Sequence, residues 1–170
     1  KKEIIQIGAI KFKSFKDVYY KKLNIYIKPK INYTLSLYIQ KLTGIKQYQL
    51  NQMSIPLRSA DIKLKNFFND VDKIFCNGLD KQILIENYKI CNLSKPFYLN
   101  KIYNIKPFLS ELLKTNQNKL VSSELHNFFK FNKINNKKHD GLNDCINIFN
   151  CISKIENIEK KLLNLSINKK

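Results

Sequence analysis

The first thirty residues alternate in the manner of two β-strands. Residues 3–12 carry apolar side chains on both alternating faces, which is typical of a strand covered on two sides. In the next run, Leu23, Ile25 and Ile27 alternate with more polar neighbours until Pro29 ends the pattern. The sequence therefore predicts a central strand followed by a half-exposed strand nearer the edge of a sheet.

Most later segments carry apolar residues at spacings of three and four, which indicates helices. One helix is predicted from Leu35 to Leu42, because Gly44 behind it can take the left-handed conformation that ends a helix. Another is predicted to open at Ser59 as its N-cap. Further helices are expected around Leu84, Tyr88 and Cys91, from Pro107, from Ser122 or Ser123, and over Leu142, Cys145, Phe149 and Ile152.

A short buried strand at residues 74–76 separates these helices, so strands come early and then alternate with helices. This order predicts an α/β domain layered as helix, sheet and helix. The 170 residues suit one domain with one substantial core, residues 1–170, in which residues 156–170 form a C-terminal helical tail.

The charge of the chain favours nucleic acid as a partner. Lys and Arg number 31 against 13 acids, for a net charge of +18, and a chain this basic attracts polyanions. Part of this charge reflects coding bias, because Arg58 is the single arginine and Asn, Ile and Lys dominate. No apolar run of membrane-spanning length and no signal-peptide pattern occurs, so we expect a cytoplasmic protein with no membrane partner and no small-molecule cofactor.

Three side chains suggest chemistry on a phosphodiester. His139 stands five residues ahead of Asp144 at the opening of a predicted helix, and Asp80 heads another helix. Nucleases that use two divalent ions need clustered carboxylates and a base for the attacking water. The pair at residues 139 and 144 alone is also typical of a solvated helix start with an acid favoured by the helix dipole.

Four segments in order resemble the DEDDh (DnaQ-like) 3′–5′ exonucleases of the ribonuclease H-like superfamily. They are Glu3-Ile-Ile-Gln-Ile-Gly-Ala-Ile, Tyr26-Ile-Lys-Pro followed by the segment ending Thr43-Gly-Ile45, residues 75–80, and His139-Asp-Gly-Leu-Asn-Asp144. The resemblance covers nearly the whole chain. It implies a ribonuclease H-like mixed β-sheet flanked by helices and a two-metal 3′–5′ exonuclease dependent on Mg²⁺ or Mn²⁺.

The resemblance also implies roles for individual residues. His139 would be the general base, Asp144 a direct metal ligand and Asp80 the second-motif acid. Thr43, Gly44 and Ile45 would lie near the terminal nucleotide of a single-stranded RNA or DNA 3′ end. The second motif is shorter than the family's usual spacing, so Asp72 remains an alternative to Asp80.

The larger departure lies at the N-terminus, where the family's first central strand carries an aspartate and a glutamate. Glu3 belongs to the following strand, and Gln6 is expected to hydrogen-bond within the fold. Two of four expected carboxylates are therefore missing, along with that strand. Two explanations stay open: an N-terminally incomplete piece, favoured because residue 1 is not Met, or a degenerate relative. We expect little nuclease activity from the chain as printed, and the alternative function is a catalytically degenerate nucleic-acid-binding module.

Overall fold

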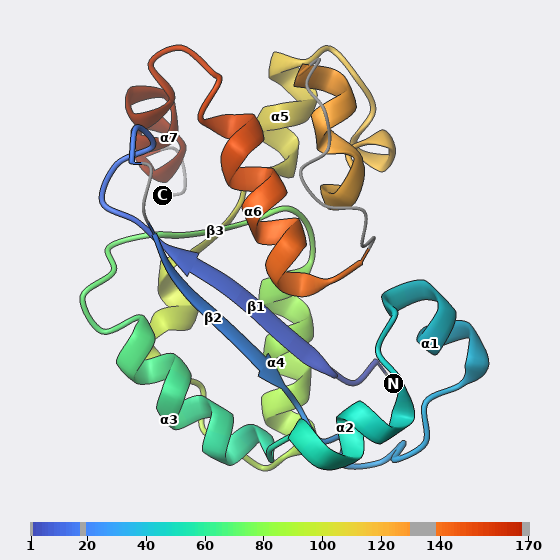
Figure 1. Cartoon of the computed structure of the whole chain (residues 1–170). Coiled ribbons are helices and arrows are strands. Elements are labelled where there is room, and N and C mark those ends of the chain that lie inside the picture. The colour runs from blue at the N-terminus through green and yellow to red at the C-terminus, as the bar shows by residue number, and fades with distance from the viewer. Residues whose placement is uncertain (1, 18–19, 130–138, 168–170) are drawn as a thin grey trace.

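The computed structural model describes residues 2–17, 20–129 and 139–167 and alternates short strands with helices (Figure 1). The elements in order are β1 (Gln6–Lys11), β2 (Lys21–Tyr26), α1 (Leu37–Thr43), α2 (Gln47–Met53), α3 (Leu57–Phe67), β3 (Ile74–Cys76), α4 (Asp80–Ile90), η1 (Phe97–Lys101), β4 (Ile102–Asn104), α5 (Lys106–Leu112), η2 (Gln117–Lys119), η3 (Ser122–Phe129), α6 (Gly141–Ile152) and α7 (Ile158–Ile167). The predicted α/β class is confirmed.

The strands of the described residues pair as two separate two-stranded sheets. β1 and β2 are antiparallel, with Ile7 opposite Ile25. β3 and β4 are parallel, with Ile74 opposite Ile102. The half-exposed character predicted for the second strand is confirmed, because Ile25 is buried and its neighbour Asn24 is exposed.

Helices cover both faces of the β1–β2 hairpin. On one face, Ile7 and Ala9 pack with residues of α3 and α4, including the fully buried Leu64 and Tyr88. On the other face, Ile10 packs with the cluster that contains Phe149 of α6. Figure 1 shows α4 passing behind β1 and β2 and the lower end of α6 lying next to β1. This is the predicted order of helix, sheet and helix.

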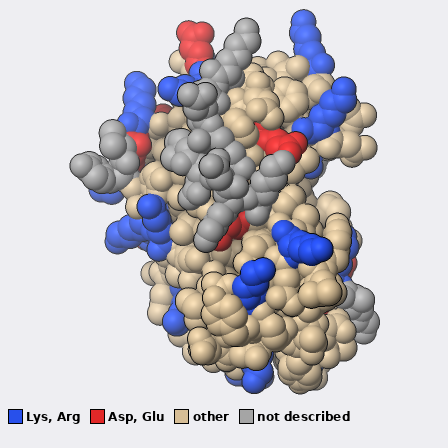
Figure 2. Space-filling model, turned by 45° about the vertical axis from the view of Figure 1, so that its right-hand side comes forward, with Lys and Arg blue, Asp and Glu red and all other residues tan. Residues whose placement is uncertain are grey.

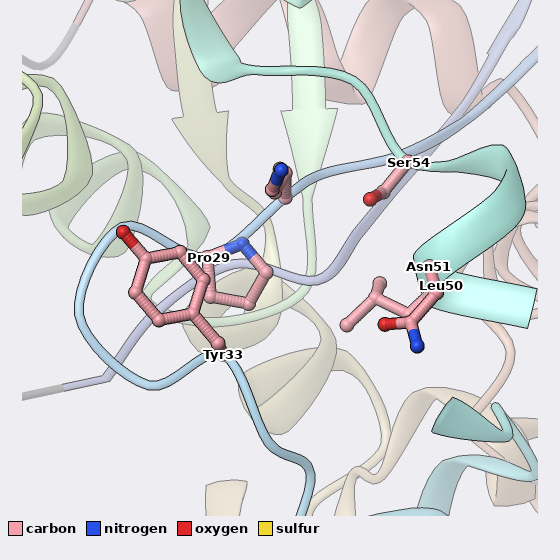
Figure 3. A pocket seen from close by; sticks show the side chains of 6 residues that line it. Pro29, Tyr33, Leu50, Asn51 and Ser54 are labelled. Atoms are coloured by element: carbon pink, nitrogen blue, oxygen red, sulfur yellow. The ribbon is translucent and has the colours of Figure 1, made fainter. Parts of the chain in front are cut away.

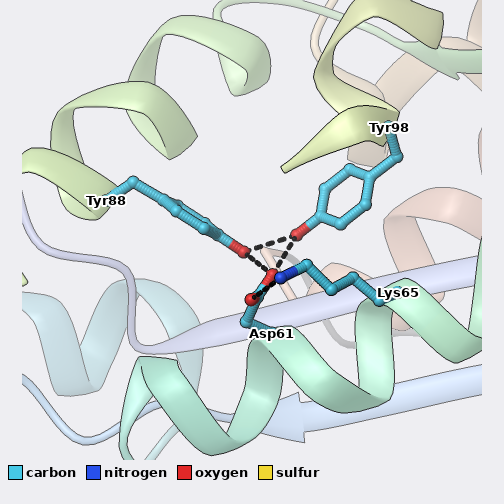
Figure 4. A network of polar contacts seen from close by, with 4 residues as sticks. All are labelled: Asp61, Lys65, Tyr88 and Tyr98. Atoms are coloured by element: carbon cyan, nitrogen blue, oxygen red, sulfur yellow. Dashed lines mark hydrogen bonds and ion pairs between the residues drawn. The ribbon is translucent and has the colours of Figure 1, made fainter. Parts of the chain in front are cut away.

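A buried polar network joins α3, α4 and η1 (Figure 4). The hydroxyl of Tyr88 donates to Asp61 at 2.5 Å and lies 2.6 Å from the hydroxyl of Tyr98. Lys65 pairs with the second carboxylate oxygen of Asp61 at 2.7 Å. Because Asp61 is only 8% exposed, these partners offset the cost of burying its charge.

Several boundaries differ from the prediction. α3 begins at Leu57 with Pro56 as its N-cap, so the assignment of Ser59 as the cap was wrong. The backbone N–H of Ser59 instead donates to the Pro56 carbonyl at 3.0 Å, inside the first turn. Residues 122–129 form a 3₁₀ helix, and α2 was not predicted because Leu50 is its one buried residue.

α7 packs into the same apolar cluster as α6. Ile155, Ile158 and Leu162 are buried there with Phe149 and Ile152. The division of the chain into one domain with a tail at 156–170 stays a prediction.

Candidate active site

The start of α6 lies directly against β1, because two glycines meet there. A Cβ on Gly8 would stand 2.2 Å from the carbonyl carbon of Gly141 and 2.3 Å from the backbone nitrogen of Leu142. No side chain fits in that space. The absence of a side chain at residue 8 therefore allows the helix backbone to approach the strand.

Gln6 holds this junction together. Its Oε1 accepts from the backbone N–H of Gly141 at 2.9 Å, and its Nε2 donates to Asp140 at 3.2 Å and Asn24 at 3.0 Å. The expectation that Gln6 hydrogen-bonds within the fold is confirmed. Asp140, which was not predicted as a cap, is the N-cap of α6 and accepts from the backbone N–H of Asn143 at 3.0 Å. An Asp just before the apolar spacing that starts at Leu142 is the signal that could have revealed it.

His139 stands immediately before this cap. It is half-buried, and its backbone has φ of 56°, in the left-handed region that non-glycine residues seldom adopt. The chain therefore turns sharply at His139 before it enters α6. The prediction that the histidine lies just before the helix is confirmed, since α6 begins at Gly141.

The thiol of Cys145 lies in surroundings that disfavour its ionisation. Burial first, and then the negative charges of Asp80, Asp144 and Asp140, raise the pKa of Cys145 to about 12. The thiol also donates to the Gly8 carbonyl at 3.2 Å. Asp80, at the start of α4, and Asp144, in the first turn of α6, thus both contribute to the negative surroundings of this thiol. From the sequence, Cys145 was predicted only as an apolar helix position, because no local pattern shows that its thiol meets the Gly8 carbonyl.

Asp80 has the same effect on a second thiol. Burial, followed by the charge of Asp80, raises the pKa of Cys76 at the end of β3 to about 11. Asp80 follows the carboxyl end of this strand, whereas Asp72 precedes its amino end in an exposed turn. Asp80 is therefore at the end of β3 that carries Cys76, and Asp72 is at the opposite end.

The segment Thr43–Ile45 is a tight turn at the end of α1. Gly44 has φ of 73°, as predicted, and the Thr43 hydroxyl donates to the Ile39 carbonyl at 2.8 Å. Ile45 is buried with Leu35 and Leu50, and Ile5 packs against this cluster. The turn and the start of α6 therefore both flank the amino end of β1, at residues 5–8.

The carboxylates in this region are the type of ligand that a hard divalent ion prefers, but they are few. No group of three or more His, Cys, Asp or Glu side chains within the described ranges lies close enough to hold a metal. Mg²⁺ is commonly bound through one or two carboxylates together with waters and substrate phosphates. Asp80 and Asp144 carry carboxylates, the hard oxygen ligands that such an ion prefers. They do not complete a two-ion site.

The chain as a whole is strongly basic. Figure 2 shows Lys and Arg side chains scattered over one face rather than gathered in a single patch. This agrees with a net charge of +18 spread along the chain. No helix formed by the described residues combines the length and apolarity needed to cross a membrane.

Solved nucleases share this fold at low sequence identity. One is a 3′-exonuclease structure that concerns 3′-end specific recognition of a histone mRNA stem-loop. It aligns with a TM-score of 0.77 and 17% identity, and the alignment covers 88% of this chain and 70% of that chain. The nuclease domain of 3′hExo, a DEDDh family member bound to rAMP, aligns with a TM-score of 0.70 and 17% identity over 89% of this chain and 91% of its own. Cell-death related nuclease 4 (CRN-4) aligns with a TM-score of 0.72 and 17% identity. The alignment covers 96% of this chain and 57% of that chain. The predicted ribonuclease H-like fold is confirmed.

Two further comparisons concern sequence rather than structure. A search of curated protein sequences gives no match. The exonuclease family model (RNase_T) matches residues 1–151, which is most of the chain and includes every residue of the site described above. The chain therefore belongs to the RNase_T exonuclease family, whose members are the DEDDh exonucleases.

Proposed function

We propose that this chain acts on single-stranded RNA or DNA as a 3′–5′ exonuclease that depends on Mg²⁺ or Mn²⁺, and that its activity as printed is weak. The observation that supports the proposal is the match of residues 1–151 to the exonuclease family model, together with the position of Asp144 in the first turn of α6, the helix that begins directly after His139 and Asp140. Family membership supplies the reaction class.

Each residue of the site has a distinct task in this proposal. Asp80 and Asp144 hold a divalent ion, which when bound neutralises phosphate charge and lowers the pKa of a coordinated water. His139 accepts the proton of the attacking water. The turn at Thr43–Ile45 positions the terminal nucleotide. Asp140 is a positioning residue, because its carboxylate is engaged by Gln6 and by the backbone of Asn143.

The substrate class follows from charge and from relatives. A chain with net charge +18 concentrates polyanions near its surface. One structural relative is a 3′-exonuclease that recognises the 3′ end of a histone mRNA stem-loop, and another was solved bound to rAMP. Both relatives favour RNA over DNA as the substrate proposed for this chain. Family members generally use divalent metal ions, which supports Mg²⁺ or Mn²⁺ as the cofactor.

The test is digestion of 5′-labelled single-stranded RNA and DNA with Mg²⁺, Mn²⁺ or a chelator. We expect slow, chelator-sensitive shortening from the 3′ end, and His139→Ala to slow it by about 10²–10⁴-fold, as expected for loss of a general base. Asp80→Asn should abolish it. Asp72→Asn is the matched control, since this exposed acid precedes β3 instead of following it. Equal losses in Asp72→Asn and Asp80→Asn would contradict the assignment.

A second candidate function is a nucleic-acid-binding module without catalysis. It is favoured by the finding that, among residues 2–17, 20–129 and 139–167, no three ligand side chains gather into a metal site. In this case the chain binds single strands with an affinity that falls steeply with salt, and no metal produces cutting.

A further inference from the structure

A hollow of about 180 Å³ lies between the loop after β2 and helix α2, apart from the acids of the active site (Figure 3). Its lining residues are Lys28, Pro29, Tyr33, Leu50, Asn51 and Ser54. Figure 3 shows Pro29 and the Tyr33 ring on one side, facing Leu50, Asn51 and Ser54 on the other. Its volume is below the roughly 300–1,000 Å³ of pockets that enclose whole drug-sized ligands, so it suits one small planar group.

The loop side of the hollow is held by Glu3. The Glu3 carboxylate accepts from the backbone N–H groups of Lys30 at 2.6 Å, Ile31 at 3.0 Å and Asn32 at 2.7 Å. Burial raises the pKa of Glu3, but these donors outweigh it, so its pKa lies below the ordinary value of 4.5. An ionised carboxylate at the start of the chain therefore fixes the loop that presents Tyr33.

The helix side is held by Gln47. Its Oε1 accepts from the backbone N–H of Leu35 at 2.7 Å, and its Nε2 donates to the Tyr33 carbonyl at 3.0 Å and to Asn51 Oδ1 at 2.8 Å. Because Gln47 takes the oxygen of the Asn51 amide, the Nδ2 donor is turned away from it. Across the described part of the chain, no hydrogen-bond acceptor is found for that donor.

These features match the needs of an unpaired nucleobase. The Tyr33 ring is 60% exposed and offers a stacking surface, while the floor is Leu50, which is 2% exposed. Asn51 Nδ2 can donate to a base carbonyl or ring nitrogen. Lys28 is exposed, with no ion-pair partner found in the described ranges, and can meet the phosphate of the same nucleotide.

We propose that this hollow binds one unpaired base of the single-stranded nucleic acid, a few nucleotides upstream of the 3′ end. The inference rests on the proposed function for the nature of the substrate. The position follows from Leu50, which floors the hollow and also packs with Ile45 of the turn that faces the terminal nucleotide. A strand with its 3′ end at that turn reaches the hollow by passing α2.

The first test is binding of fluorescent single-stranded oligonucleotides, measured by anisotropy in EDTA so that no cutting occurs. Tyr33→Ala should raise Kd on the order of five- to one-hundred-fold, whereas Tyr33→Phe keeps the stacking ring and should bind like the wild type. Tyr48→Ala is the matched control, because Tyr48 is 62% exposed on α2, next to the hollow's Leu50 and Asn51 in sequence, but does not line the hollow. Asn51→Asp keeps the acceptor for Gln47 and removes the donor, so it should also bind more weakly.

The second test locates the base by moving a single abasic site along the oligonucleotide. The wild type should lose affinity at one position near the 3′ end, and Tyr33→Ala should lose that dependence on position. The proposal is overturned if Tyr33→Ala binds like Tyr48→Ala, or if the abasic scan is flat. If both binding experiments give the expected results but no cutting is detected, only the proposed catalysis is refuted. If the protein cuts but its affinity does not depend on the position of the abasic site, only the binding of a base in the hollow is refuted.

Discussion

The contact between Gly8 and Gly141 yields the sharpest prediction. In Gly8→Ala, the added Cβ would stand 2.2 to 2.4 Å from three backbone atoms of Gly141 and Leu142. Ordinary van der Waals contact begins at 3.4 Å. Because all three obstructing atoms belong to backbone, no side-chain rotation relieves the clash. α6 must therefore move away from β1 by about 1 Å or more.

The cost combines steric strain with lost hydrogen bonds. Overpacking of a tight contact costs about 1–3 kcal/mol. Displacing α6 also strains the bonds from Gly141 to Gln6 and from Cys145 to Gly8, each of which contributes about 0.5–1.5 kcal/mol. If both bonds are lost, we expect Gly8→Ala to lower the free energy of unfolding by about 2–6 kcal/mol. Any cutting should fall further, since a misplacement of about 1 Å can cost 10²-fold in rate.

Urea unfolding followed by far-ultraviolet circular dichroism measures this effect. The control is Gly44→Ala, whose Cβ meets nothing within 4 Å but whose backbone keeps φ of 73°. This variant should lose about 1–2 kcal/mol from left-handed strain alone and leave α6 in place. A Gly8→Ala protein as stable as the wild type would refute the close approach of α6 to β1.

Two further predictions concern buried and charged groups. Tyr88→Phe removes the donor at 2.5 Å from Asp61 and should lower the free energy of unfolding in urea by about 1–3 kcal/mol, while Tyr48→Phe, on an exposed ring, should change nothing. Glu3→Gln should destabilise the protein at pH 7, because the folded state lowers the pKa of Glu3. The difference from the wild type should hold above pH 4.5 and shrink as the pH falls through the folded pKa; a difference that grows in acid would contradict the role of the carboxylate.

The sequence by itself determined the local elements. Alternation defined β1 and β2, and the spacing of Leu142, Cys145, Phe149 and Ile152 defined α6. Gly44 ends α1 in the left-handed conformation, which it can adopt because it has no side chain. These features were predictable because each depends on neighbours within one or two turns of the chain. α2 escaped prediction because its one buried residue, Leu50, leaves no periodic pattern.

Only the tertiary structure decided how the site is assembled. Asp80 begins α4 and Asp144 lies in the first turn of α6, and no local pattern fixes how these two helices are placed on the β1–β2 hairpin. The position of Asp144 depends on the docking of α6 against β1, which two glycines allow and Gln6 secures. The hollow beside Tyr33 likewise requires Gln47 and Glu3 to hold separate segments together. Long-range packing makes these contacts, and a periodicity that describes one element at a time carries no information about them.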